Sequence, residues 1–140
     1  LHFVFHISTV IFRKHLPQMG ENILRAMLSA PGLRAVVLET FGAGNAPTNE
    51  WFIRVLKEAI DRGVIILNIT QCGGGKVSME LYETGLRLQK IGVLCGHDMT
   101  TEAAVTKLMY VLGLGLSDEQ TRALLRRALL RRPLRGEFTA

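Results

Sequence analysis

Short apolar runs alternate along the chain with longer amphipathic segments, and this alternation restricts the fold more than any other feature. We expect strands at residues 4–12, 33–39, 64–69 and 93–95. Parallel strands that are apolar at nearly every position are usually covered on both faces, and a helical segment between consecutive strands allows a right-handed crossover. The sequence therefore predicts an α/β fold: a small doubly wound, flavodoxin-like sheet of about four parallel strands with helices on both faces.

Apolar residues at helical spacing, bounded by capping and stop signals, predict the helices. We expect helices at residues 18–29, 49–62, 77–90, 101–112 and 117–130. Asn49 can cap the second helix, and either Asp98 or Thr100 can cap the fourth. Ser117, followed three residues later by Gln120, has the arrangement of a capping box for the fifth helix. The buried stripe expected on the fourth helix consists of Ala104, Val105, Leu108 and Met109.

The length and composition fit a single domain over residues 1–140. Hydrophobic residues make up 48% of the chain, which is too many for a disordered segment. No apolar run approaches the ~20 residues that a membrane-spanning helix needs. The two cysteines cannot form a disulfide scaffold, so a reducing, intracellular compartment is the simpler interpretation. The chain begins at Leu1 within a strand-like stretch, and we interpret this as a start inside a longer protein.

Two glycine-rich loops follow expected strands at their carboxyl ends, where parallel sheets bind ligands. The first, TFGAGNAPT at 40–48, contains Asn45, whose amide can both donate and accept hydrogen bonds; a tight strand-to-helix connection is the structural alternative. The second, TQCGGGK at 70–76, ends at Lys76 but lacks the Ser or Thr that follows the lysine of a P-loop. Cys72 in this loop is a nucleophile only if its pKa is lowered, and otherwise a small buried residue.

The other chemistry-bearing residues do not form a catalytic set. His97 and Asp98 are adjacent, so their side chains point apart, and capping suits Asp98 better than a dyad. Cys95 is expected to be a small buried residue of its strand. The chain has no CxxC pair, and we expect no metal site. We therefore expect a domain that completes a site built mainly elsewhere.

The net charge of +5 arises mainly near the C-terminus, where arginines interleave with leucines. This pattern predicts an amphipathic helix with a basic outer face that is solvated or faces another subunit. No aromatic residues stand between the arginines to stack on bases, so nucleic acid is not the expected partner. The arginines concerned are Arg122, Arg126, Arg127, Arg131, Arg132 and Arg135.

Four segments, in order, resemble the C-terminal domain of the cytoplasmic (type I) L-asparaginases. They are VVLETFGAGNAPT, DRGVIILNITQC, GHDMTTEAAVTKLMYVLG and LRGEFT, and the resemblance extends over roughly residues 33–140. It implies a cytoplasmic amidohydrolase that converts L-asparagine and water to L-aspartate and ammonia without a cofactor. The threonine nucleophile of this family lies in a larger N-terminal domain, so the chain alone is expected to be inactive. Its implied partners are that domain and a second subunit, in a homodimer or dimer of dimers, and neither nucleic acid nor a membrane.

The resemblance also implies roles for individual residues. Asn45 matches the asparagine of the family's G-x-G-N loop, which contributes to the substrate site. Thr70 and Cys72 match two residues of an allosteric asparagine site found in some bacterial members, and a structural role for this loop is the other possibility. Glu39 stands where those members have an arginine, which reverses the charge that would meet the ligand carboxylate, so we expect no such site. A free-standing α/β binding module for a small anion or nucleic acid is the alternative function.

Overall fold

Four parallel strands form the centre of the fold. The computed structural model describes residues 8–12, 20–40, 49–70, 76–77 and 83–130. Within these, the sheet has the order β1-β2-β3-β4 and consists of β1 (Ser8–Phe12), β2 (Leu33–Thr40), β3 (Ile65–Thr70) and β4 (Leu94–Cys95). Every neighbouring pair is parallel, and Asn68 of β3 lies between Leu38 of β2 and Cys95 of β4. The carboxyl ends of β2, β3 and β4 therefore meet at one edge.

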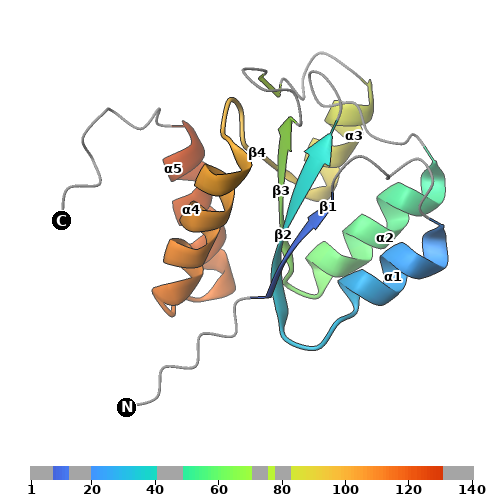
Figure 1. Ribbon diagram of the computed structural model, residues 1–140, viewed down its shortest axis with the longest axis horizontal. Coiled ribbons are helices and arrows are strands. Elements are labelled where there is room, and N and C mark those ends of the chain that lie inside the picture. The colour runs from blue at the N-terminus through green and yellow to red at the C-terminus, as the bar shows by residue number, and fades with distance from the viewer. Residues whose placement is uncertain (1–7, 13–19, 41–48, 71–75, 78–82, 131–140) are drawn as a thin grey trace.

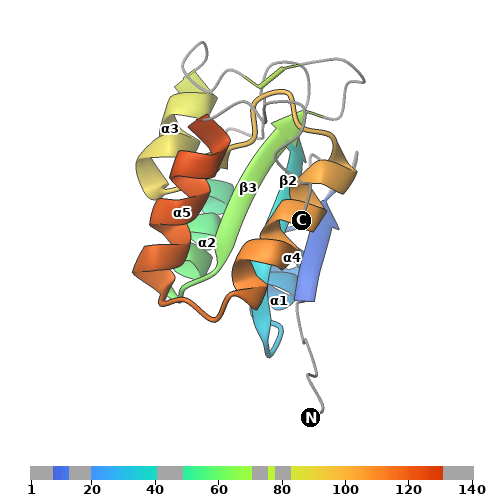
Figure 2. The same cartoon turned by 90° about the vertical axis from the view of Figure 1, so that its left-hand side faces the viewer.

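Helices cover both faces of the sheet in two separate layers (Figures 1 and 2). One layer consists of α1 (Glu21–Leu28), α2 (Glu50–Asp61) and α3 (Glu83–Ile91), which connect consecutive strands. The other consists of α4 (Thr101–Gly113) and α5 (Asp118–Leu130), which follow β4. The prediction of an α/β fold with about four parallel strands and helices on both faces is confirmed.

The strand order differs from the flavodoxin-like order expected from the sequence. In a doubly wound sheet the order reverses at a switch point, and the crossover helices then lie on both faces. Here the described strands lie in chain order, and all three crossover helices lie on one face. Successive right-handed crossovers in one direction place their helices on the same side of the sheet. The pattern of apolar residues predicted that both faces are covered, but it does not tell which helices cover them.

Alternate side chains of β2 and β3 enter two different hydrophobic cores. On the α1–α3 face, the fully buried side chains include Leu24, Val36, Leu38, Phe52, Ile66 and Leu88. On the α4–α5 face they include Ala35, Val37, Leu67, Ile69, Leu108 and Leu125. Burial on both faces explains why these two strands are apolar at nearly every position.

The buried stripe of α4 is rotated relative to the predicted one. The buried residues are Ala104, Leu108, Val111 and Leu112, which follow the spacing of one helical face. Val105 is only partly buried and Met109 is 48% exposed. The prediction was therefore correct for Ala104 and Leu108. It was wrong for Val105 and Met109, which are apolar but lie beside the buried stripe.

Side chains at the helix starts confirm one capping prediction and decide another. The amide of Gln120 donates to Ser117 Oγ at 3.2 Å, and the amide of Ser117 donates to Gln120 Oε1 at 3.2 Å. This is the reciprocal capping box predicted from the sequence. At α4, Thr100 Oγ1 accepts from the amide of Ala103 at 3.2 Å, so Thr100 and not Asp98 is the cap.

Replacement of Ser117 by alanine tests the capping box. We expect Ser117→Ala to lower the free energy of unfolding by about 1 kcal/mol, because the Gln120 amide loses its acceptor. Urea denaturation followed by circular dichroism measures the change. Ser29→Ala is the control, since Ser29 is exposed at the end of α1, and it should cost less than about 0.5 kcal/mol. Equal losses in the two variants would contradict the capping role.

Candidate functional site at the carboxyl edge of the sheet

Buried polar side chains gather where β2 and β3 end. Glu39, Thr40 and Asn68 are at most 1% exposed, and Thr70 is 8% exposed. The Thr40 hydroxyl donates to Asn68 Oδ1 at 2.9 Å and also approaches the carbonyl oxygen of Ile69 at 3.3 Å. This three-centre contact joins the last residue of β2 to β3. It lies at the edge where loops of parallel sheets bind ligands.

The Glu39 carboxylate is held on the opposite face of β2. It accepts a hydrogen bond from the hydroxyl of Thr101, the first residue of α4. The amino end of a helix favours negative charge, because its first amides have no partners within the helix and the helix dipole is positive there. The Glu39 side chain is therefore anchored to the amino end of α4.

Asn68 is the least satisfied of these groups. Its Oδ1 accepts from Thr40, and its backbone carbonyl accepts from the amide of Gly96 at 2.8 Å. Its Nδ2, however, is buried and has no hydrogen-bond partner in the described part of the chain. A buried donor without an acceptor costs about 1–3 kcal/mol. Asn68 is thus not explained by packing alone.

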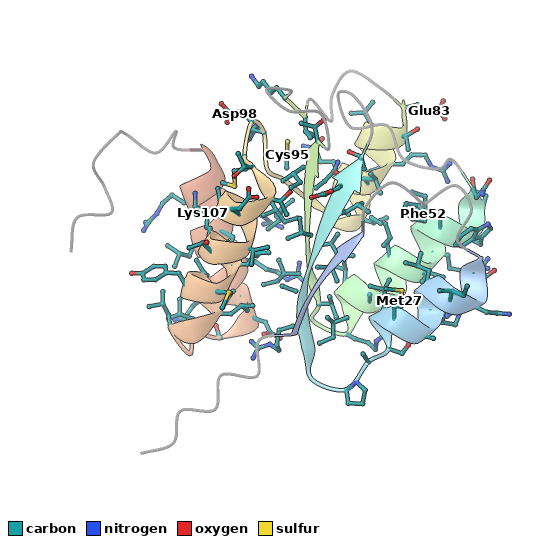
Figure 3. All side chains as sticks on the ribbon, viewed as in Figure 1. Met27, Phe52, Glu83, Cys95, Asp98 and Lys107 are labelled. Carbon is teal, nitrogen blue, oxygen red and sulfur yellow. The ribbon has the colours of Figure 1, made fainter. Side chains whose placement is uncertain are left out.

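The end of β4 adds a thiol and an imidazole to this edge. Cys95 Sγ lies 3.7 Å from the Val77 carbonyl oxygen and 3.7 Å from His97 Nδ1. The Val77 amide donates to the His97 carbonyl at 2.9 Å, and His97 has a positive φ of 53°. Cys95 is partly buried and packs against the core on the α1–α3 face, so the prediction of a small buried residue is correct only in part. In Figure 3, Asp98 lies at the outer turn before α4, whereas Cys95 lies closer to the sheet.

A match to a known protein family identifies the family of this domain. The Glutaminase/Asparaginase C-terminal domain family matches residues 9–125. The chain belongs to this family. Escherichia coli (strain K12) L-asparaginase 1 is 43% identical over 123 residues, which cover 88% of this chain and 35% of that protein. The 60 kDa lysophospholipase of Homo sapiens is 44% identical over 124 residues, which cover 88% of this chain and 20% of that protein.

A solved structure supports the same assignment. L-asparaginase I from Vibrio cholerae O1 biovar eltor superposes with a TM-score of 0.74 at 42% identity, over 96% of this chain and 38% of that one. The predicted resemblance to the C-terminal domain of the type I L-asparaginases is therefore confirmed. The chain spans about a third or less of the length of these relatives.

The predicted site residues of this asparaginase-family domain fall in different parts of the chain. Thr70 is the last residue of β3 and is buried. Asn45 and Cys72 lie outside the described residues, so their predicted roles stay predictions. Lys76 is exposed. Within the described ranges, no group of three or more His, Cys, Asp or Glu side chains could hold a metal ion.

One arginine of the basic C-terminal helix has a structural role that the sequence did not reveal. Arg122 Nη2 donates to the carbonyl oxygens of Ile60 and Val64, each at 3.2 Å. These bonds join α5 to the turn between α2 and β3. Arg126 and Arg127 are exposed, as predicted for a basic outer face, and the arginines at 131, 132 and 135 lie outside the described residues. None of the described helices is long and apolar enough to cross a membrane.

Charged groups with shifted pKa values lie away from this edge. Hydrogen bonds from Arg25 and then Arg54 lower the pKa of Glu21, and hydrogen bonds to Glu21 and Glu58 raise the pKa of Arg25. These ion pairs lie on the surface of α1 and α2. Partial burial lowers the pKa of Lys107, six residues and hence about 9 Å along α4 from its first residue. Neither set provides a proton donor or acceptor at the carboxyl ends of β2 and β3.

Gly96 is a second residue that the sequence analysis missed, although it opens the GHDMTT segment. A Cβ at this position would lie 2.6 Å from Ile69 Cγ2 and 3.0 Å from the Asn68 carbonyl oxygen. The chain leaving β4 can therefore approach β3 this closely only without a side chain.

Replacement of Gly96 by alanine tests this close contact. We expect Gly96→Ala to lower the free energy of unfolding by about 1–3 kcal/mol, because the added methyl group forces β3 and the β4 exit apart. Thermal or urea unfolding measures the loss. Gly20→Ala is the control, since a Cβ there meets nothing within 4 Å, and it should cost less than about 1 kcal/mol. A Gly96→Ala variant as stable as the parent chain would contradict the contact.

Proposed function

We propose that this chain is the C-terminal domain of an enzyme that hydrolyses L-asparagine to L-aspartate and ammonia. In this proposal the domain completes the active site and the subunit interface, and is inactive alone. The observation that carries it is the match to the L-asparaginases of E. coli and V. cholerae at 42–43% identity over nearly the whole chain. The segment GAGNAPT supports it, because it resembles the loop that contributes to the family's substrate site, and the segment TQC supports membership of the family.

The described side chains supply no complete nucleophilic set of their own. The Thr40 hydroxyl donates to the amide oxygen of Asn68, which is not a base. The Thr101 hydroxyl donates to the carboxylate of Glu39, which is 1% exposed. The thiol of Cys95 and the imidazole of His97 are 3.7 Å apart, longer than the usual reach of a nucleophile and its base. We therefore assign the nucleophile to the N-terminal domain that the resemblance implies, and the substrate-site role to Asn45.

The proposed partners are that N-terminal domain and a second subunit of the same protein. Apolar side chains on and after α4 support an interface, since Met109, Tyr110 and Leu114 are 48%, 62% and 44% exposed. We propose a cytoplasmic location and a reaction without cofactor, nucleic acid or membrane, on the resemblance alone.

We further propose that the chain lacks an allosteric asparagine site. Glu39, at the position of the arginine that some bacterial members use, is 1% exposed and accepts a hydrogen bond from Thr101. A buried carboxylate would repel the carboxylate of the ligand. In this proposal Thr70, the last residue of β3, and Cys72 have a structural role instead.

The activity is tested by ammonia release from L-asparagine. A polypeptide that joins an asparaginase N-terminal domain to this chain should release ammonia, and the 140-residue chain should release none. In the longer protein, Asn45→Ala should lower kcat/KM about 10–100-fold, as expected when a hydrogen bond to a charged group is lost. Asn49→Ala is the matched control, because Asn49 occupies the N-cap position of α2 without a side-chain capping bond.

Three outcomes would contradict this proposal. Ammonia release by the purified 140-residue chain would show that it holds a complete site. Release of fatty acid from lysophosphatidylcholine, with no ammonia from asparagine, would assign instead the activity named for the human relative. Saturable RNA or nucleotide binding with a steep salt dependence would favour the alternative of a free-standing binding module.

A further inference from the structure

We propose that Thr40 and Asn68, together with Glu39 and Thr101, are positioning residues that hold the end of β2 from both faces. We name these four residues the β2 exit clamp. The chain that leaves the clamp enters the loop carrying Asn45, five residues after Thr40. The inference rests on the proposed function, because Asn45 matters for catalysis only if that loop serves an asparagine site.

The first half of the clamp joins β2 to its neighbour β3. Thr40 is paired in register with Thr70, yet its hydroxyl reaches back to Asn68 Oδ1 at 2.9 Å and to the Ile69 carbonyl at 3.3 Å. Thr40 and Asn68 are both 0% exposed, so water does not compete for this contact. The contact therefore fixes the last residue of β2 against β3 in direction as well as in distance.

The second half joins the preceding residue of β2 to the other layer. Successive residues of a strand point to opposite faces, so Glu39 points toward α4 where Thr40 points toward the α1–α3 side. The Glu39 carboxylate accepts from Thr101, at the start of α4. Two adjacent buried polar residues thus anchor the end of β2 to two different elements, directly before the chain leaves the sheet.

The unpaired Nδ2 of Asn68 indicates that the clamp fixes the direction in which the chain leaves β2 more than it stabilises the fold. An apolar residue of similar size at this position would leave no buried donor without an acceptor, whereas Asn68 Nδ2 has none in the described residues. Replacement of both partners of a buried hydrogen bond by apolar groups can be neutral or stabilising. The Thr40–Asn68 pair is therefore best explained by what its geometry does to the chain that follows.

Such geometry matters for catalysis because small displacements of a substrate-site residue are costly. A misplacement of about 1 Å caused by a change distant from the reacting atoms can lower the rate about 100-fold. The clamp acts through Asn45 and does not itself touch the substrate. It is predicted to affect kcat/KM without being part of the catalytic set.

Variants of Thr40 and Asn68 in the longer, active protein separate positioning from stability. Thr40→Val should lower kcat/KM at least about tenfold and also lower Tm, because Asn68 Oδ1 loses its donor. Thr40→Ser keeps the hydroxyl and should retain most of the activity. The double variant Thr40→Val/Asn68→Leu should recover Tm toward that of the parent but keep the low kcat/KM, because it restores packing without the directional bond.

The other half of the clamp has its own matched pair. Thr101→Val removes the donor to Glu39 and should lower kcat/KM, whereas Thr101→Ser should not. Thr106→Val is the control, since Thr106 is exposed on the same helix. Recovery of kcat/KM together with Tm in the Thr40/Asn68 double variant would show a merely structural role and overturn the proposal.

Amide hydrogen exchange provides a readout that does not depend on activity. In the double variant, exchange over the residues that include Asn45 should rise at least about tenfold while exchange in α2 stays unchanged. Unchanged exchange at both places would overturn the clamp even if the enzyme is active. An unmutated protein without asparaginase activity would contradict the proposed function, and the exchange result would then decide the clamp alone.

Discussion

The fold depends on the burial of β2 and β3 on both faces. Their alternate side chains fill two separate cores, with Leu38 and Ile66 against α1–α3 and Val37 and Leu67 against α4–α5. A strand buried in this way has no face on which a polar side chain can reach water, so each polar residue needs a partner inside the protein. Glu39, Thr40 and Asn68 meet this requirement with bonds to other elements, apart from the Asn68 amide nitrogen. The burial of both faces therefore stabilises the sheet and also requires the polar residues at its carboxyl edge to bond to one another and to α4.

The sequence predicts local features of this fold well and long-range ones less well. The apolar runs predicted the strands, and the Ser117–Gln120 pair predicted its reciprocal capping bonds, because both depend on residues close in the chain. The strand order and the choice of Thr100 over Asp98 depend on tertiary packing and on loop geometry. The Thr40–Asn68 bond joins residues 28 positions apart. In the sequence this bond is indicated only by the single amide residue, Asn68, within the apolar strand IILNIT, and the sequence does not show which residue it bonds to.

Arg122 illustrates the same difference for the basic C-terminal helix. Counted by charge, it belongs with the exposed Arg126 and Arg127, yet its guanidinium binds the carbonyls of Ile60 and Val64. A long side chain can bury its stem and still satisfy distant backbone groups, which no count of charges reveals. The family resemblance was the stronger signal for function, since it compares whole loops in order. In the described geometry, the hydroxyls of Thr40 and Thr101 already donate to acceptors of the fold, which agrees with the proposal that the nucleophile lies in another domain.

The single-faced set of crossover helices has a consequence for how the molecule assembles. The segment from β1 to β4, with α1–α3, contains the whole described sheet and one complete core, all built from elements that are neighbours in the chain. Contacts between chain neighbours form quickly, because they close short loops. Until α4 and α5 dock, however, the opposite face of the sheet presents Ala35, Val37, Ile65, Leu67 and Ile69 to solvent. The last two helices thus cover this face of the sheet. A chain that ends before them would expose the apolar face to other molecules and would be prone to aggregate.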